Sequence, residues 1–509
     1  MRRGPFSISL RCSQVKTAST AYGEATDNWG TIRCSLSIYT RRAAAVLVLL
    51  CMSAAPELAR AQDQSVQAAI PQRPAIMFNR WQEDWSVLAD PRIPREPFDD
   101  LKYIPLSETD PQTYLSFGAD TRDRFESNNA QGFGIGGNRG QNYVLSRNEF
   151  HADLRVADQL QFFLQFQSDF APWKDRPLPI DRNRLDLEQA FVALTEPLGN
   201  GTLRLRLGRQ QIGFDLQRFV SVRDGPNVRQ SYDGAWAEYE TGPWRFNLLY
   251  SLPVQTRDDA AFDDDSGVDH QTFAGMRVER KLSESTTISA YYARFTQANG
   301  RFANAAGDER RDIFDVRVSG RANQFDWDLE AMNQTGRIGA RNIEAWAFGG
   351  LAGYTFADLP WTPRLGIQVD AASGDSKTAG SDFGTFNPLF PNGAYLMLAG
   401  YTGYSNLVHV KPSLTLYPTS SVKVMLAAAA QWRENTADAV YTYPAVPVPN
   451  TAGRPGAYTG SYGQVRVDWT IDRATSLAIE AVHFAIGDTL RNAGGHDANY
   501  VGVEFKREW

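Results

Sequence analysis

Apolar and polar residues alternate at every second position along most of the chain from Tyr114 onward, which is typical of β-strands with two different faces. In the segment LRLRLGRQ, Leu203 and Leu205 fall on one face and Arg204 and Arg206 on the other. The segments QLQFFLQFQ and GQVRVDWTI repeat the pattern. The runs extend over ten to thirteen residues. Strands of soluble proteins usually have ~5–6 residues, whereas a tilted strand that crosses a membrane needs ~9–11. The pattern therefore favours membrane-crossing strands.

The chain contains 18 segments of this kind, and an even number is usual for single-chain outer-membrane barrels. They cover residues 113–127, 143–157, 158–170, 185–196, 201–212, 233–241, 243–253, 271–282, 286–297, 310–321, 324–335, 341–356, 362–373, 405–417, 421–434, 460–471, 475–486 and 498–509.

The connections between these segments alternate in length. Short turns such as VADQ, ETGPW, LSES and DRATS follow one end of the strands, and long polar or Gly-rich connections follow the other end. The long connections include residues 128–141, 171–184, 213–231, 255–269, 371–404 and 435–459. No sustained 3.6-residue periodicity indicates helical crossovers there. The sequence thus predicts an all-β protein: a transmembrane antiparallel β-barrel of about 18 strands with short periplasmic turns and long extracellular loops.

The last segment, VGVEFKREW, places Val501, Val503, Phe505 and Trp509 on one face of a strand. We expect this face to contact outer-membrane lipid, with Trp509 in the periplasmic aromatic girdle. A final strand of this pattern is also expected to be read by the outer-membrane assembly machinery.

The segment TRRAAAVLVLLCMSAAPELARA, residues 40–61, has two arginines, an apolar run and a small-x-small site, and these features predict a secretory signal cleaved near Ala61. A buried helix of a soluble domain is the less favoured alternative, and the apolar run is too short to span a bilayer. We expect residues 1–61 to be an N-terminal extension plus signal peptide, residues 62–112 a periplasmic segment and residues 113–509 the barrel. The residues before Thr40 are either an unusual N-terminal extension or the result of a start codon assigned too early, and we expect the second.

Composition adds constraints on chemistry. The three cysteines, Cys12, Cys34 and Cys51, all precede Ala61, so no disulfide is expected in the exported chain. The five histidines are scattered, and no motif indicates a nucleophile, a phosphate loop or a cofactor. The segment DDDSGVD, residues 263–269, only partly matches a calcium loop, and a solvated loop is the preferred interpretation. We expect no enzyme activity, no metal or other cofactor and no nucleic-acid partner.

A barrel of ~16–18 strands encloses an aqueous channel whose selectivity depends on lumen-facing side chains. The polar face of the first five strands carries charges of both signs. The candidate pore-lining residues there are Arg122, Arg124, Glu126, Arg147, Glu149, Arg155, Asp186, Glu188, Arg204 and Arg206. One interpretation is a structural lattice of ion pairs that stiffens the wall. The other is a series of weak sites for a polyuronate, because guanidinium groups bind carboxylates bidentately and neighbouring carboxylates moderate that binding.

Several blocks of the sequence resemble the alginate-export outer-membrane porin family. They are RWQEDWSVLADPRIPREPFDDLKYIPL, YLSFGADTRDRFE, LRLGRQ with QRFVSVRDGPNVRQSYDG, and GTFNPLFPNGAYLMLAG with NLVHVKPSLTLYPT. The resemblance covers nearly all of residues 62–509. It implies an 18-stranded monomeric barrel in the outer membrane of a Gram-negative bacterium, narrowed by arginines, that secretes an anionic polysaccharide.

The resemblance also implies that the segment RFVSVRDGPNVRQS folds inward and constricts the pore. This adds Arg218, Arg223, Asp224 and Arg229 to the candidate substrate-binding residues, although Asp224-Gly225 is equally a turn signal. Arg209 in the LRLGRQ block is a further candidate. The segment FNPLFPNG, residues 386–393, is expected to be a packed rim or lid. The predicted function is diffusion or secretion of an alginate-like anionic polysaccharide or oligosaccharide. Uptake of other small anions or sugars, or a loop-mediated adhesin or barrel enzyme, are the alternatives.

Overall fold

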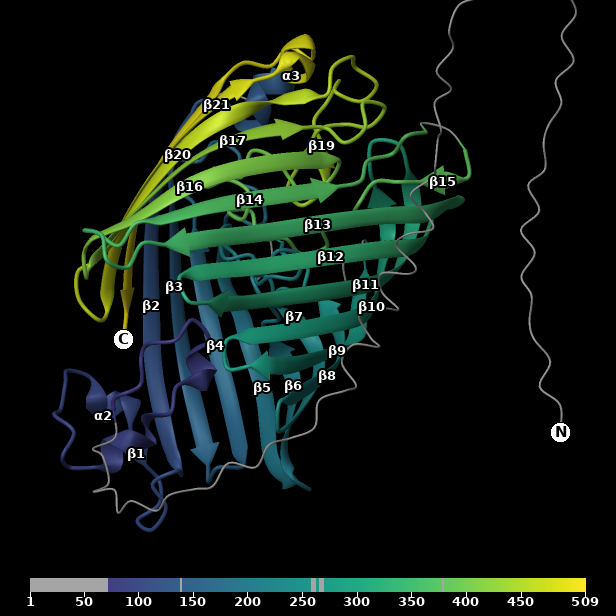
Figure 1. The fold of residues 1–509 in the computed structure, drawn as a ribbon. Coiled ribbons are helices and arrows are strands. Elements are labelled where there is room, and N and C mark those ends of the chain that lie inside the picture. Colours follow the sequence, from purple (N-terminus) through teal and green to yellow (C-terminus); the bar gives the residue numbers. More distant parts are fainter. Residues whose placement is uncertain (1–71, 138–139, 258–261, 265–269, 378–379) are drawn as a thin grey trace, which may run out of the picture. The chain divides into compact units, whose positions relative to one another are not determined.

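The computed structural model describes residues 72–509 apart from residues 138–139, 258–261, 265–269 and 378–379. Its main feature is a single 20-stranded sheet, in which β1 and β15 are additions of two residues each. The other 18 strands are long, pair antiparallel with their neighbours and close into a barrel (Figure 1). Closure is made by β2 and β22, which pair from Asp120 with Glu508 to Asn128 with Tyr500. The predicted all-β barrel of 18 strands is confirmed.

The long strands match the alternating segments of the sequence. They are β2 (Tyr114–Asn128), β3 (Gln141–Val156), β4 (Leu160–Phe170), β5 (Asn183–Leu198), β6 (Gly201–Gln210), β7 (Tyr232–Thr241), β8 (Trp244–Pro253), β9 (Gln271–Ser283), β10 (Thr286–Arg301), β11 (Ala306–Ala322), β12 (Phe325–Ile338), β13 (Arg341–Thr355), β14 (Arg364–Ala372), β16 (Leu407–Thr419), β17 (Val422–Trp432), β20 (Tyr458–Thr470), β21 (Thr475–Ile486) and β22 (Ala498–Glu508).

The minor elements are not among the 18 long strands of the barrel. They are the 3-10 helices η2 (Arg80–Gln82), η3 (Trp85–Ala89) and η4 (Gln131–Gly137), the α-helices α2 (Asp99–Lys102) and α3 (Asp488–Asn492), the added strands β1 (Ile104–Pro105) and β15 (Asp382–Phe383), and the separate pair β18 (Tyr441–Thr442) and β19 (Val446–Pro447). Among the described residues, no helix has the length and apolar character needed to span a membrane.

The alternation of short and long connections is also confirmed. One rim, here called the turn rim, carries connections such as residues 157–159, 199–200 and 242–243. The opposite loop rim carries the long connections, of which residues 373–406 and 433–457 are the longest. Two connections on the loop rim are nevertheless short, residues 302–305 and 339–340, because β10, β11 and β12 extend further towards this rim than the sequence pattern predicts.

The barrel has apolar side chains on its outer face and charged side chains in its interior. In β21, Ile479 is 46% exposed on the outside, whereas its neighbour Glu480 is buried. The largest fully buried side chains include Arg147, Arg218 and Arg311. This arrangement is the reverse of a soluble protein and is expected when lipid surrounds the wall and water or charge fills the interior.

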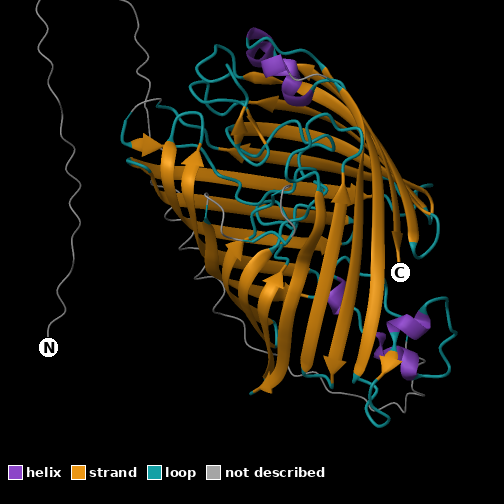
Figure 2. Ribbon diagram, turned by 180° about the vertical axis from the view of Figure 1, so that it is seen from behind, coloured by secondary structure: helices purple, strands orange, loops and turns teal. Residues whose placement is uncertain are grey.

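Two connections of the loop rim fold into the interior (Figure 2). The lumen loop, residues 211–231, and the lid loop, residues 373–406, pack together through Phe219 and Phe386, whose ring centroids are 5.4 Å apart. Val220 and Phe390 also form a parallel backbone bridge. Both loops join an apolar cluster with inward side chains of β7 to β13. FNPLFPNG is therefore packed, and its position is inside the barrel.

Residues 72–112 form a small unit at the turn rim beside the start of β2. Trp85, Leu88 and Tyr103 pack against Tyr114 of β2, and Arg73 binds Asp99 through both guanidinium nitrogens at 2.6 and 2.7 Å. The predicted signal peptide and the three cysteines lie outside the described residues.

Candidate functional site

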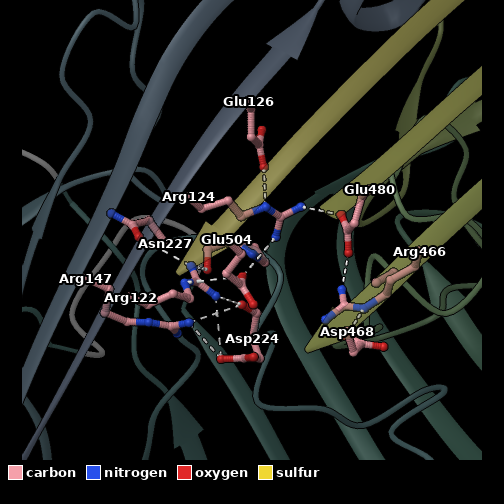
Figure 3. Close-up of polar contacts among 12 residues, drawn as sticks. Arg122, Arg124, Glu126, Arg147, Asp224, Asn227, Arg466, Asp468, Glu480 and Glu504 are labelled. Atoms are coloured by element: carbon pink, nitrogen blue, oxygen red, sulfur yellow. Dashed lines mark hydrogen bonds and ion pairs between the residues drawn. The ribbon is translucent and has the colours of Figure 1, made fainter. Parts of the chain in front are cut away.

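The centre of the charged interior is a group of three arginines around Asp224 of the lumen loop. The guanidinium of Arg147 on β3 and that of Arg229 each lie 2.8 Å from Oδ1 of Asp224. Arg122 on β2 donates to the backbone oxygen of Asp224 at 2.7 Å and lies 3.8 Å from the carboxylate (Figure 3). The strands supply two arginines through their inward faces, and the loop supplies both the third arginine and the carboxylate.

Asp224 is an anion that solvent still reaches. Its side chain is 45% exposed, whereas the side chains of Arg122 and Arg147 are 5% and 2% exposed. Burial of the surroundings raises the pKa of Asp224, but the positive charges of Arg147, Arg229 and Arg122 outweigh it and hold that pKa well below its usual range. Three cations are thus held in place by one lumenal carboxylate, which is the position that a carboxylate of a ligand would take.

The ion pairs continue from this group along the wall. Arg124 lies 2.9 Å from Glu126, 3.5 Å from Glu480 on β21 and 3.9 Å from Glu504 on β22. Glu480 also pairs with Arg466 of β20 (Figure 3). Cations and anions therefore alternate across neighbouring strands, which supports the lattice interpretation for these residues.

A second group lies on the far wall. Arg218 of the lumen loop pairs with Glu330 of β12, and Asp215 lies 2.7 Å from both Arg277 of β9 and Arg317 of β11. Since Asp224 and Arg229 of the same loop bind β2 and β3, the lumen loop crosses the interior from one wall to the other. The inward fold expected for this segment is present.

The other predicted residues are also paired. Arg155 binds Asp153 at 3.1 Å, Arg204 binds Glu238 and Glu240 at 3.0 and 2.7 Å, Arg209 binds Asp233 at 2.8 Å and lies 3.7 Å from Asp186, and Arg229 lies 2.7 Å from Glu149 and 3.8 Å from Glu188.

Two predicted arginines differ from the rest, since neither Arg206 nor Arg223 forms an ion pair with any described residue. The guanidinium of Arg206 lies 4.3 Å from the ring of Trp81 and 5.5 Å from that of Trp236. Arg223 donates to the backbone oxygen of Leu389 at 3.1 Å, and burial lowers its pKa. An anion could bind either arginine without breaking an existing ion pair.

The sequence reasoning missed part of the site. The polar faces of β20 to β22 carry Arg466, Glu480 and Glu504. The same alternation of apolar and polar positions that identified residues on the first five strands also marks these three. Phe78 and Trp81 were missed for another reason: they precede the barrel, and no periodic pattern indicates that their segment contacts the interior.

A closed antiparallel barrel with an apolar outer face and a charged interior defines a channel of the outer-membrane porin class. The family model for alginate export matches residues 113–504, and the chain belongs to this family. Its location is the outer membrane of a Gram-negative bacterium. No curated protein matches the sequence.

Solved structures with a similar fold are outer-membrane porins. A BenF-like porin from Pseudomonas fluorescens Pf-5 aligns with a TM-score of 0.53 at 9% identity and covers 78% of this chain and 99% of its own. OccD3 (OpdP) of Pseudomonas aeruginosa aligns with a TM-score of 0.53 at 11% identity and covers 81% and 93%. At these identities the likeness shows the fold alone.

Among the residues that the structure describes, no group of three or more His, Cys, Asp or Glu side chains is arranged to hold a metal ion. In the DDDSGVD segment, Asp263 is buried and accepts from Asn183 at 2.9 Å, so it is packed against the wall, whereas residues 265–269 lie outside the described part.

Proposed function

We propose that this channel conducts an anionic oligosaccharide or polysaccharide of the alginate type, and that the group formed by Arg122, Arg147, Arg229 and Asp224 is its selective site. The observation that carries the proposal is the exposed carboxylate of Asp224 held by three buried arginines. A uronate carboxylate has the same charge and shape as the Asp224 carboxylate. A polyuronate can therefore exchange with Asp224 and pass from one arginine to the next.

Transit needs binding that is strong enough for entry and weak enough for release. The carboxylates of Glu149, Glu126 and Glu480 supply the moderation, because each already occupies an arginine that the ligand would otherwise hold tightly. Passive conduction of this kind runs in whichever direction the gradient dictates. Uptake of other small anions is the second candidate, and the unpaired Arg206 and Arg223 favour it, since a small anion needs only one cation.

The test is the variant Asp224→Asn in planar bilayers. Removing the carboxylate frees the three arginines, so the reversal potential should shift towards anions. Block by oligouronates should tighten roughly ten- to a hundredfold, as a charge-assisted contact contributes roughly 1.5–3 kcal/mol. Asp488→Asn, which removes the same charge from the 74%-exposed side chain in α3, serves as control. Equal behaviour of the two variants would show that the Asp224 group does not select the ligand.

Block by a neutral oligosaccharide of the same length separates the two candidates. If the oligouronate and the neutral sugar block equally in the wild type, the site does not recognise carboxylates and the polyuronate assignment fails. If small carboxylates block as well as oligouronates, uptake of small anions is the better description.

A further inference from the structure

The segment before the barrel enters the lumen. We call residues 77–85 the lumen strap. It contains η2, and its backbone oxygens of Trp81 and Glu83 accept from Arg155 of β3 at 2.9 and 2.7 Å. Gln161 of β4 donates to the oxygen of Trp81 as well, at 2.9 Å. Because these donors project from the inner face of the wall, the strap lies inside the barrel at the turn rim.

The base of the strap is firmly held. Arg80 is 2% exposed, lies 2.7 Å from Glu83 and pairs with Asp120 of β2. Glu83 in turn accepts the backbone N–H of Met77 at 2.8 Å and the indole N–H of Trp85 at 2.9 Å. A buried and fully bonded base of this kind does not exchange easily with solvent.

The aromatic side chains of Phe78 and Trp81, here called the tip of the strap, are held differently. Phe78 is 39% exposed, and its ring lies against the guanidinium of Arg229, which is 4.6 Å from the ring centroid. Trp81 covers the unpaired guanidinium of Arg206 at 4.3 Å. A cation–π contact is a weak attraction, and the further ring contact of Trp81 is an edge-on one with Phe191 of β5 at 5.9 Å. The two rings can therefore rotate away from the arginines while the backbone of the strap stays bonded to β3 and β4.

Phe78 and Trp81 therefore cover two arginines that an anion in the lumen would use, one in the Asp224 group and one that has no carboxylate partner. We propose that the lumen strap is an autoinhibitory closure of the channel, in which the backbone is anchored at Arg80 and Glu83 and the side chains of Phe78 and Trp81 are the movable part. An anionic ligand that binds Arg206 and Arg229 displaces the two rings and opens its own path. This last step rests on the proposed function, whereas closure by the strap does not.

The test measures single-channel currents of the full chain in KCl alone. In the double variant Phe78→Ser/Trp81→Ser the tip no longer covers the lumen, so we expect fewer closed intervals and an open conductance higher by roughly twofold, as for removal of an apolar constriction. Leu106→Ser is the control, because Leu106 is 54% exposed in the same N-terminal unit and outside the strap. Currents equal to those of the wild type would overturn the proposal.

A second measurement decides the matter if the double variant does not fold. With Cys12, Cys34 and Cys51 replaced by serine, Phe78→Cys is treated with an anionic methanethiosulfonate during recording. Modification should lower the current of Phe78→Cys but not that of Leu106→Cys. An unchanged current in both would place Phe78 outside the ion path and exclude the closure. If the channel passes these tests but oligouronates do not block it, the proposed function is wrong and the proposed closure by the strap still holds.

Discussion

At the scale of single residues, Lys102 at the end of α2 is the clearest titratable group outside the barrel wall. Its side chain is 4% exposed, and its ammonium lies 5.1 Å from the ring of Trp85 and 5.4 Å from that of Trp509. Burial, with help from the charge of Arg80, lowers the pKa of Lys102 to about 7. The other ionisable groups that act on it are Glu83, Asp120, Arg473 and His151.

The sign of the pH effect follows from this shift. Docking here means the packing of residues 72–112 against β2. Between pH 7 and the ordinary lysine pKa of about 10.4, Lys102 binds a proton in the undocked segment but not in the docked one, so docking becomes more stable as pH rises. Below pH 7 both states are protonated and the dependence disappears. We expect trypsin cleavage after the exposed Arg92 to slow, relative to that of Lys102→Met, by up to about tenfold per pH unit between pH 7 and 9. If the cleavage rates of the wild type and of Lys102→Met depend on pH in the same way, Lys102 does not control docking.

The sequence predicts on which face of a strand each side chain lies, but it does not predict the ion-pair partner of each charged side chain. Alternation correctly assigned Arg122 and Arg124 to the polar face of the first strand. Arg122 meets Asp224 across 102 positions of sequence, and Arg124 meets Glu480 across 356. Such pairs depend on strand order and on loop conformation, neither of which local periodicity encodes.

At the scale of elements, the lid loop depends on one aromatic side chain. Phe390 packs edge-on against Tyr232, Phe273 and Phe295 at 5.2, 5.8 and 5.9 Å, and its backbone exchanges hydrogen bonds with the lumen loop. Phe390→Ala should cost about 3–5 kcal/mol in this cluster. The loss should be local, because the backbone hydrogen bonds of the wall remain.

We expect Phe390→Ala to accelerate trypsin cleavage at the exposed Lys377 of the lid loop while the barrel keeps its folded mobility on a gel. Phe348→Ala is the matched control, since Phe348 is 37% exposed on the outer face of β13. Cleavage at the wild-type rate in both variants would mean that the lid is held by contacts other than Phe390.

The elements differ in how far they could be predicted. Each of the 18 long strands follows from a local alternation, since one face meets lipid and the other the lumen. The inward course of the lumen loop rested on the family resemblance alone. The inward courses of the lid loop and of the lumen strap were not predicted, because their apolar residues, such as Phe390 and Trp81, pack on strands far away in the sequence.

At the scale of the whole molecule, the outer face determines stability in the membrane. Ile479 lies near the middle of β21 with 46% of its surface exposed, and Ile471 lies in a turn-rim connection with 45% exposed. Ile479→Arg should lower the free energy of unfolding in liposomes by about 2–4 kcal/mol, and Ile471→Arg by about 0–1, because the cost of a charge falls from the midplane to the interface. The heat-modifiable gel band during a urea titration measures both. Equal losses would contradict the assigned depth of β21.

The anchor of the lumen strap has a consequence for the order of assembly. Arg80 binds Asp120 on the first long strand and, at 2.8 Å, the backbone oxygen of Trp509 just after the last one. These two acceptors come together only when β2 and β22 have paired. The anchor of the strap is thus complete only in a barrel in which the first and last long strands are paired. Seating of the strap therefore distinguishes finished barrels from unfinished ones.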